Sequence, residues 1–421
     1  MHDCRFTFNI IFFLYIASVF GQRTEERISF EDVSCEIDSI VMNAIRNEAF
    51  PGCVVYASKG DSVFFSKSYG YHTYDSTRRV AINDIYDLAS VTKVMGATLA
   101  LMKLYENGAF SLDDPIYQYL KGIGRKVGDV TFREALAHQA GLYPWIPYYK
   151  ESKKRNGDFK NGIIKSHYDE NYQYQLSDSL FLHDDFYDEI KRMIKRSEVS
   201  LEKGYRYSGL FFYLIPEIVE NLSGEDFDSY LKTQFYDSMN LETLGFNPLN
   251  RFDETQIAPT EIDTFFRGTN IHGVVHDEGA IMMKGVSGNA GLFGNATDVS
   301  KIWQMLLNDG SYEGVEYLKS QTIELFTTAQ YPNNENRRGL GFDKPLLQYD
   351  SLISSVAKEA SFRSYGHTGY TGTLVWADPE NDLLFIFLSN RVYPSRTYTN
   401  IYKLNVRPTI HQLFYDYLRE N

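Results

Sequence analysis

Long apolar segments are almost absent from this sequence, and the one exception is N-terminal, where residues 6–20 are nearly all hydrophobic. This run is too short to span a bilayer comfortably, and the small residues Ser18 and Gly21 stand at its end. The pattern predicts a cleaved signal peptide at residues 1–21 and therefore an exported protein, periplasmic or extracellular. The alternative is an uncleaved anchor, because Arg5 is the one basic side chain before the run.

Cysteine is equally rare, with three residues in a chain of 421. No combination of Cys and His has the spacing of a zinc site, so we expect no metal. Because Cys4 precedes the apolar run, cleavage would leave Cys35 and Cys53. An exported protein could pair these thiols. We favour two buried free thiols, since one disulfide adds little to a chain of this size.

The chain has fewer basic than acidic side chains. The chain has 42 Lys and Arg against 55 Asp and Glu, a net charge of −13, and no basic stripe. Nucleic acid is therefore excluded as a partner, because nothing would neutralise its phosphates. A cationic or neutral substrate is compatible with this charge. With 43% hydrophobic residues, the composition is that of an ordinary globular chain with a large core.

Internal repeats and Pro/Ser-rich linkers are also missing, so the order of strand and helix patterns must define the domains. Strand patterns occur early and late in the chain, with helix patterns between them. This order predicts one α/β sheet domain built from residues 22–89 and 285–421, with a mainly helical domain, residues 90–284, inserted. Residues 143–180 are rich in Tyr, Lys, Asn and Asp and are expected to form a surface excursion, a candidate lid.

A candidate nucleophile stands in the stretch "LASVTK", just where a helical pattern begins. Ser90 and Lys93 are three positions apart and would share one helix face. A buried lysine can remove the proton from a serine, and the first-turn N–H of Ser90 is free to bind an oxyanion. On this motif alone, a helix-start serine with a solvated lysine is the more common arrangement.

Two further motifs change that interpretation. The first is "GYRYSGLFFYL", in which Tyr207 stands at a loop-to-helix junction and could shuttle a proton; the alternative is a packed aromatic. The second is "YGHTGYTGTLVWADPE", in which glycines flank His367 and Thr368 at the start of a strand. Glycines allow close approach to a ligand, and a free N–H at Tyr370 would be a second oxyanion donor. The alternative is an ordinary Gly-rich hairpin.

In this order the three motifs resemble the S-x-x-K, Y-x-N or S-D-N, and K-T-G elements of the penicillin-binding protein and class C β-lactamase superfamily. They stand here as Ser90 to Lys93, Tyr207 to Gly209, and His367 to Gly369. "TFREALAHQAGL", "VVHDEGAIMMKGVSGNAGLFGNATDVSKIW" and "FIFLSNRVYP" resemble the same branch, especially the β-lactamase-type module fused to family-three glycosidases in some bacterial cell-wall proteins. The resemblance covers roughly residues 35 to 418.

The resemblance implies an antiparallel β-sheet flanked by helices, with the active site between the sheet and the helical domain. It also implies acyl-enzyme chemistry without a cofactor. Ser90 would attack an ester or amide, Lys93 and Tyr207 would move the proton, and the N–H groups of Ser90 and Tyr370 would hold the oxyanion. His367 and Thr368, with Gly369, would contact a substrate carboxylate or acyl group. If His367 binds a substrate carboxylate, binding should weaken as the pH rises through the folded pKa of this histidine, whose unperturbed value is about 6.5.

One difference from the family pattern leaves open whether the protein is an active enzyme. Gly209 replaces an Asn or Asp whose side chain would bind the lysine and the substrate amide. We expect a serine hydrolase acting on a peptide, a muropeptide-like amide or an ester, with an association with the cell wall. The competing interpretation is a catalytically weak module that holds cell-wall fragments. The sequence does not determine the oligomeric state.

Other candidates are weaker. The cluster His272, His276, Asp277 and Glu278 fits a rim loop held by side-chain hydrogen bonds better than a metal site. His138 is expected to be structural, and Trp145 is a candidate wall of the substrate cleft.

Overall fold

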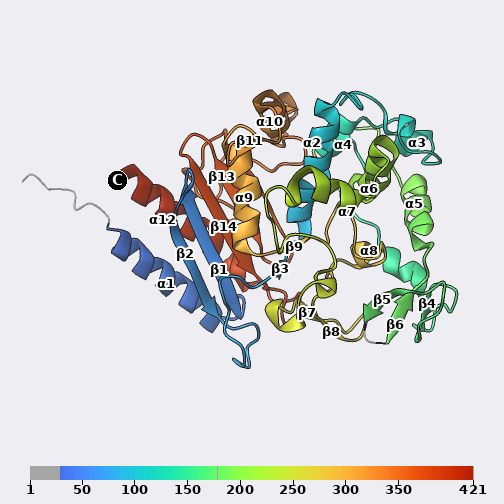
Figure 1. Cartoon of the computed structure of the whole chain (residues 1–421), viewed down its shortest axis with the longest axis horizontal. Helices are drawn as coiled ribbons and strands as arrows, with labels where there is room; N and C mark the ends of the chain where they lie inside the picture. The colour runs from blue at the N-terminus through green and yellow to red at the C-terminus, as the bar shows by residue number, and fades with distance from the viewer. Residues whose placement is uncertain (1–28, 178, 421) are drawn as a thin grey trace, which may run out of the picture.

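A five-stranded antiparallel sheet forms the centre of one half of the molecule, with the strand order β12-β13-β14-β1-β2 (Figure 1). The computed structural model describes residues 29–177 and 179–420, so the predicted signal peptide lies outside the described residues. The sheet strands are β1 Gly52–Lys59, β2 Ser62–Gly70, β12 Tyr365–Thr368, β13 Leu374–Asp378 and β14 Leu383–Ser389. The prediction of one antiparallel sheet assembled from both ends of the chain is confirmed.

The central strand β14 is buried along its whole length because both faces of the sheet are covered. Its alternate side chains enter two different hydrophobic cores, with Phe385 and Phe387 on one face and Leu384 and Ile386 on the other. A strand buried on both faces reads as a continuous apolar run, as "LLFIFLS" does.

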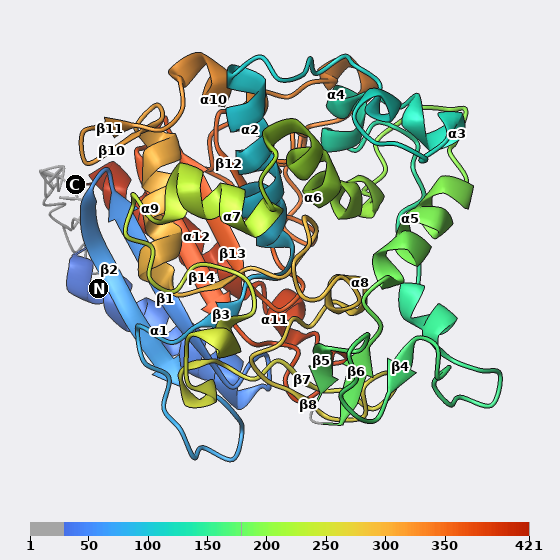
Figure 2. The same ribbon diagram turned by 45° about the vertical axis from the view of Figure 1, so that its right-hand side comes forward.

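Helices cover both faces. On one face lie α1 (Phe30–Arg46), which begins with a capping box between Ser29 and Asp32, and α12 (Val406–Glu420). On the other lies α9 (Ala296–Leu307), and beyond it the helical half of the molecule (Figure 2).

The helical half is less purely helical than predicted. Its longest helix is α6 (Leu210–Ser223), and a π-helix, Lys93–Thr98, leads into α2 (Leu99–Glu106). The predicted excursion, residues 143–180, carries a 3₁₀ helix, Tyr148–Ser152, and most of a small sheet of order β4-β6-β5. The strands of that sheet are β4 Ile164–Lys165, β5 Tyr174–Ser177 and β6 Leu180–Leu182.

The remaining elements are short connections between these parts. The further helices are α3 Arg125–Gly128, α4 Phe132–Leu136, α5 Phe186–Arg196, α7 Phe227–Leu231, α8 Glu278–Ile281, α10 Ser320–Thr327 and α11 Asn400–Lys403. The further strands are β3 Tyr86–Asp87, β7 Glu261–Ile262, β8 Asn270–Ile271, β9 Phe293–Gly294, β10 Ser311–Tyr312 and β11 Val315–Glu316. One hydrophobic core runs from the sheet into the helices, and the predicted domain boundaries stay a prediction.

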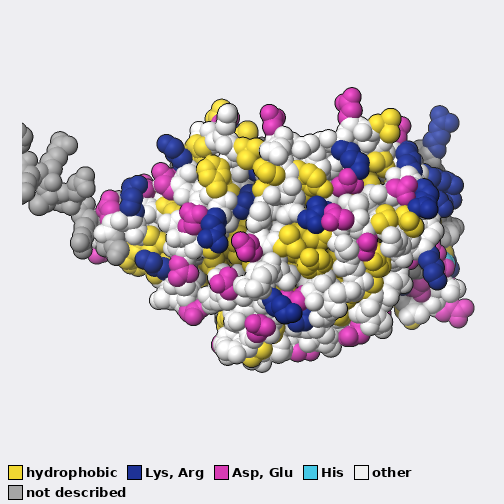
Figure 3. Space-filling view, turned by 90° about the horizontal axis from the view of Figure 1, so that it is seen from above, with side chains coloured by type: hydrophobic (Ala, Val, Ile, Leu, Met, Phe, Trp, Pro, Cys, Tyr) yellow, Lys and Arg dark blue, Asp and Glu magenta, His cyan; other side chains and the backbone are white. Residues whose placement is uncertain are grey.

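Cys35 and Cys53 are unpaired, as expected, but the expectation that both are buried is wrong for Cys35. Cys53 is buried in β1, and burial raises the pKa of its thiol, whereas Cys35 is exposed on α1. None of the described helices combines the length and the apolar character that a membrane span requires. Figure 3 shows acidic and basic side chains interspersed over one face.

Candidate active site

Ser90 lies in a short 3₁₀ turn, Ala89–Val91, just before the helix that carries Lys93. The turn is strained, because Ala89 has a φ of 46°, in the left-handed region. Asp87 holds it in place: Oδ1 accepts the backbone N–H of Ala89 at 2.8 Å, and Oδ2 accepts that of His276 at 2.7 Å. The predicted helix start is therefore a braced turn that fixes the backbone of Ser90.

Lys93 is 3% exposed, and its Nζ donates to Ser90 Oγ at 3.0 Å. It also donates to the backbone carbonyl oxygen of Asn289 at 2.8 Å. The structure thus brings together the serine and lysine that the sequence pattern placed on one face. The Asn289 contact was missed, because a backbone carbonyl from a distant segment leaves no signature in the sequence.

Tyr207 lies immediately before α6, as predicted, and Lys93 Nζ is 5.6 Å from the centre of its ring. The ring of His138 packs on it at 4.5 Å between centroids. His138 is 2% exposed, and its Nδ1 accepts the backbone N–H of Ser208 at 3.2 Å. We expected His138 to be structural, and its contacts support the segment that carries Tyr207.

The loop between β12 and β13 packs directly on the Ser90 turn. A Cβ atom at Gly369 would stand 2.7 Å from the carbonyl oxygen of Leu88, closer than real Cβ contacts. Two threonines of the loop also donate to this segment, Thr371 Oγ1 to the Asp87 carbonyl at 2.8 Å and Thr373 Oγ1 to that of Leu88 at 3.2 Å. Glycine is needed at position 369 because the loop approaches the Ser90 turn so closely.

This packing places two unused backbone donors at one pocket. Within the described residues, the N–H groups of Ser90 and Tyr370 donate to no protein acceptor, and both residues line the same cavity. Two such N–H groups beside a serine Oγ are the arrangement that binds the oxyanion of an acyl-transfer intermediate.

His367 lies in β12 and is 3% exposed, and its Nδ1–H donates to the carbonyl oxygen of Thr368 at 2.8 Å. Burial, with the charges of Arg338 and Lys93, lowers its pKa to about 3. The imidazole is therefore neutral near pH 7, so a loss of carboxylate binding caused by this histidine would occur well below neutral pH. Contact of His367 and Thr368 with a substrate stays a prediction, because neither lines the pocket.

The pocket beside Ser90 has a volume of about 460 Å³ and mainly apolar walls. The predicted residues that line it are Ser90, Lys93, Tyr207, Gly209 and Tyr370. Trp145, a candidate cleft residue from the sequence, also lines it and is 48% exposed. Such a pocket can hold the acyl side of a small peptide or ester.

The far rim carries a buried charge network. His276 Nε2 and Glu261 Oε2 are 2.7 Å apart, and Arg396 Nη2 donates to Glu261 at 2.6 Å and to Glu278 at 2.8 Å. Burial opposes the charge of Glu261, but hydrogen bonds from His276 and Arg396 outweigh it and lower its pKa to about 2. The predicted rim loop held by side-chain hydrogen bonds is confirmed for His276, Asp277 and Glu278, whereas His272 lines the larger pocket described below.

Gly209 precedes α6 with an ordinary φ of −86°. A Cβ atom here would meet a single neighbour, Tyr213 Cε2 at 3.8 Å. Neither the backbone nor the packing around a Cβ atom therefore requires glycine, and Gly209 lines the same pocket as Lys93.

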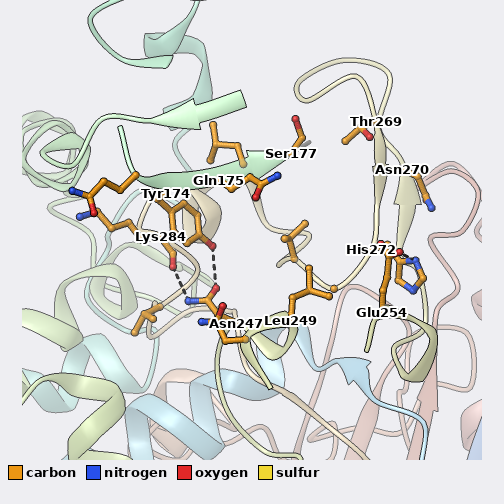
Figure 4. Close-up of a pocket in the computed structure, with 16 residues that line it drawn as sticks. Tyr174, Gln175, Ser177, Asn247, Leu249, Glu254, Thr269, Asn270, His272 and Lys284 are labelled. Atoms are coloured by element: carbon orange, nitrogen blue, oxygen red, sulfur yellow. Dashed lines mark hydrogen bonds and ion pairs between the residues drawn. The ribbon is translucent and has the colours of Figure 1, made fainter. Parts of the chain in front are cut away.

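A larger pocket, of about 720 Å³, lies elsewhere, between the small sheet and residues 247–286. Figure 4 shows Tyr174, Asn247 and Lys284 along one side of it and His272 on the other. Tyr174 Oη donates to Asn247 Oδ1 at 3.0 Å. None of its described lining residues is a serine hydrogen-bonded to a base, so the smaller pocket is the candidate reaction site.

Comparison with known proteins agrees with this geometry. The family model described as Beta-lactamase matches residues 37–407. A relative named "Putative D-alanyl-D-alanine carboxypeptidase" from Escherichia coli (strain K12) is 30% identical over 369 residues, which cover 81% of this chain and 79% of the relative. A relative of the same name from Salmonella typhi is 29% identical and covers 91% of this chain and 89% of its own length.

Solved structures show the same fold. EstCE1, a hydrolase with promiscuous acyltransferase activity, has a TM-score of 0.63 at 18% identity, covering 91% of this chain and 99% of that one. The octameric penicillin-binding protein homologue from Pyrococcus abyssi has a TM-score of 0.62 at 18% identity, covering 88% and 76%. The chain therefore belongs to the β-lactamase family and is a serine hydrolase of the β-lactamase and D,D-peptidase type.

Proposed function

We propose that this protein is an exported hydrolase that forms an acyl-enzyme on Ser90 and acts on peptide or muropeptide-type amides and on esters. The observation that carries the proposal is the 3.0 Å contact from Lys93 Nζ to Ser90 Oγ, at a pocket that also holds the free N–H groups of Ser90 and Tyr370. Nucleophile, base and oxyanion donors then converge on one space.

The reaction has two steps. Ser90 Oγ attacks the carbonyl carbon while its proton passes to Lys93 or Tyr207, and the oxyanion lies between the two N–H groups. The bond to the leaving group then breaks, and the same pair returns the proton to the departing amine or alcohol. Water repeats the sequence on the acyl-enzyme, releases the acid and restores the Ser90 hydroxyl.

The names of the relatives and the sequence motifs support this substrate class. D-alanyl-D-alanine carboxypeptidase, the activity in those names, cleaves a peptide amide. The resemblance to the module fused to family-three glycosidases of cell-wall proteins points to the same material. The predicted signal peptide at residues 1–21 would deliver the protein to it.

A module that only binds cell-wall fragments is the second candidate. The observation that favours it is Gly209, which supplies no side-chain contact to Lys93 or to a substrate amide. The contact between Lys93 and the Asn289 carbonyl argues against it, because the lysine is held without that side chain.

The test is intact mass spectrometry after treatment with a fluorophosphonate and an activated ester, with turnover measured on a D-alanyl-D-alanine peptide. We expect one added mass on Ser90, and no labelling or turnover in Ser90→Ala. Hydrolysis that persists in Ser90→Ala would overturn the mechanism. A folded wild type that neither labels nor turns over any ester would favour the binding module.

A further inference from the structure

A buried guanidinium, outside all three motifs, lies next to Tyr207. Arg338 is 5% exposed, and its Cζ is 5.3 Å from the centre of the Tyr207 ring. Its Nη1 is 3.5 Å from His367 Nε2. Arg338 does not line the pocket beside Ser90, so any effect on the reaction must pass through a neighbour.

The charge of Arg338 is permanent and only partly neutralised. An arginine side chain does not lose its proton in proteins. Asp343 lies 3.2 Å from Arg338 Nε, but the same carboxylate also accepts Arg337 Nε at 2.9 Å and Nη2 at 3.2 Å. One carboxylate thus serves two guanidinium groups, which leaves a net positive charge beside the pocket.

The groups around Tyr207 are either cationic or neutral. Lys93 and Arg338 both lie within 6 Å of its ring centre, at 5.6 and 5.3 Å. The imidazoles of His138 and His367 also face the ring, and burial lowers the pKa of both, so they are neutral near pH 7. Within the described residues no carboxylate is hydrogen-bonded to Tyr207 or paired with it. Tyr207 therefore has two cationic side chains near its ring and no carboxylate partner among the described residues.

We propose that Arg338 is a positioning residue for proton transfer: its fixed charge stabilises the phenolate form of Tyr207, which accepts the proton of Ser90 and becomes a neutral phenol. In the K-T-G pattern the lysine of the third motif carries a positive charge. His367 stands in that place here, and its neutral imidazole carries none. Lys93, which donates to both Ser90 Oγ and the Asn289 carbonyl, acts as a hydrogen-bond donor in this step. The proton moves from Ser90 Oγ to Tyr207 Oη and then to the leaving group. The inference rests on the proposed function.

The experiment is the pH profile of kcat and kcat/KM on a neutral activated ester for wild type, Arg338→Met and Arg338→Lys. Loss of the guanidinium should lower kcat roughly 10- to 100-fold, as expected for one nearby charge, and move the acid limb of the profile to higher pH with little change in KM. Arg338→Lys should recover much of the rate. Arg337→Met is the matched control, because it keeps the Arg338 guanidinium next to Tyr207 but frees Asp343 to pair with it alone, so the acid limb should move less than in Arg338→Met.

Three results would overturn the inference. The first is an unshifted acid limb in folded Arg338→Met. The second is an equal loss in Arg337→Met. The third is a change confined to the KM of carboxylate-bearing substrates, which would make Arg338 a substrate-binding residue. If Arg338→Met does not fold, Arg338→Gln takes its place, because it also removes the charge and an unshifted acid limb in that variant would likewise overturn the inference. Failure of the proposed function itself would instead appear as activity in Ser90→Ala.

Discussion

The backbone carbonyl oxygen of Asn289 lies 2.8 Å from the Nζ atom of Lys93. The same ammonium donates to Ser90 Oγ at 3.0 Å, so the lysine is aimed at the serine by main-chain geometry. This contact performs part of the task that the family assigns to an Asn or Asp side chain at position 209. It explains how the site can keep a placed lysine although Gly209 has no side chain.

Gly209→Asn should fold and should raise kcat on amides more than on esters. The backbone at position 209 has an ordinary φ, and the space for a side chain is open. Because Asn289 already holds Lys93, the gain should come from pairing with the substrate amide, about 1.5 kcal/mol or roughly tenfold. Matched amide and ester substrates with one acyl group would measure it.

Gly209→Ala is the control for this substitution, since it adds a Cβ atom without a hydrogen-bonding group. It should leave the ratio of amide to ester turnover unchanged. An equal ratio in folded Gly209→Asn would show that the position is not a missing catalytic contact.

Gly369→Ala should strongly reduce acylation. The new Cβ would clash with Thr373 Oγ1 in the same loop and would stand 2.7 Å from the Leu88 carbonyl oxygen, so the loop would have to shift relative to the Ser90 turn. Displacement of the Tyr370 N–H should then cost about 10²- to 10³-fold in kcat, as for the loss of one oxyanion donor. The rate of labelling by an activated ester measures this, and circular dichroism checks folding. Gly162→Ala is the control, because a Cβ there meets nothing within 4 Å; equal labelling rates in both variants would refute the role of the loop.

Trp145→Ala should raise KM about 5- to 20-fold and change kcat little. The indole is 48% exposed and lines the pocket beside Ser90. Burial of a large aromatic against a substrate contributes about 1–2 kcal/mol of binding. Steady-state kinetics with an aromatic ester tests this. Tyr168→Ala removes a ring that is 63% exposed and outside that pocket, and a similar rise in KM there would contradict the assignment.

Stability should fall as the pH drops below about 6.5. Burial lowers the pKa of His367 and His411 to about 3 and that of His138 well below its ordinary value. The unfolded chain takes up protons near its ordinary pKa of about 6.5, while the native state does not. The free energy of unfolding therefore decreases as the pH falls from 6.5 towards 3, by up to about 1.4 kcal/mol per pH unit for each histidine.

Urea midpoints at pH 7.5 and pH 5 would measure this loss. His411→Asn removes one titrating group far from the pocket and keeps an acceptor for the Ala357 N–H, which donates to His411 Nδ1 at 3.3 Å. This variant should lose less stability between the two pH values. An unchanged difference would mean that the buried histidines do not set the acid sensitivity.

The sequence by itself determined the elements whose signals are local. Alternating and continuous apolar runs bounded by turns gave the sheet strands, because side-chain direction repeats along a strand. Ser90 and Lys93 could be paired in advance, because three residues of helical backbone bring two side chains to one face. Glycines around His367 predicted a close approach, and Gly369 makes one.

Tertiary structure alone decided the contacts between distant segments and the charges they produce. The carbonyl of Asn289 reaches Lys93 across 196 positions of sequence, and Arg338 meets Tyr207 from a loop that carries no motif. His367 has a neutral imidazole because the fold excludes water from it and places a guanidinium beside it. A sequence lists the titratable groups, but their protonation depends on burial and on neighbouring charges, which exist only once the chain has folded.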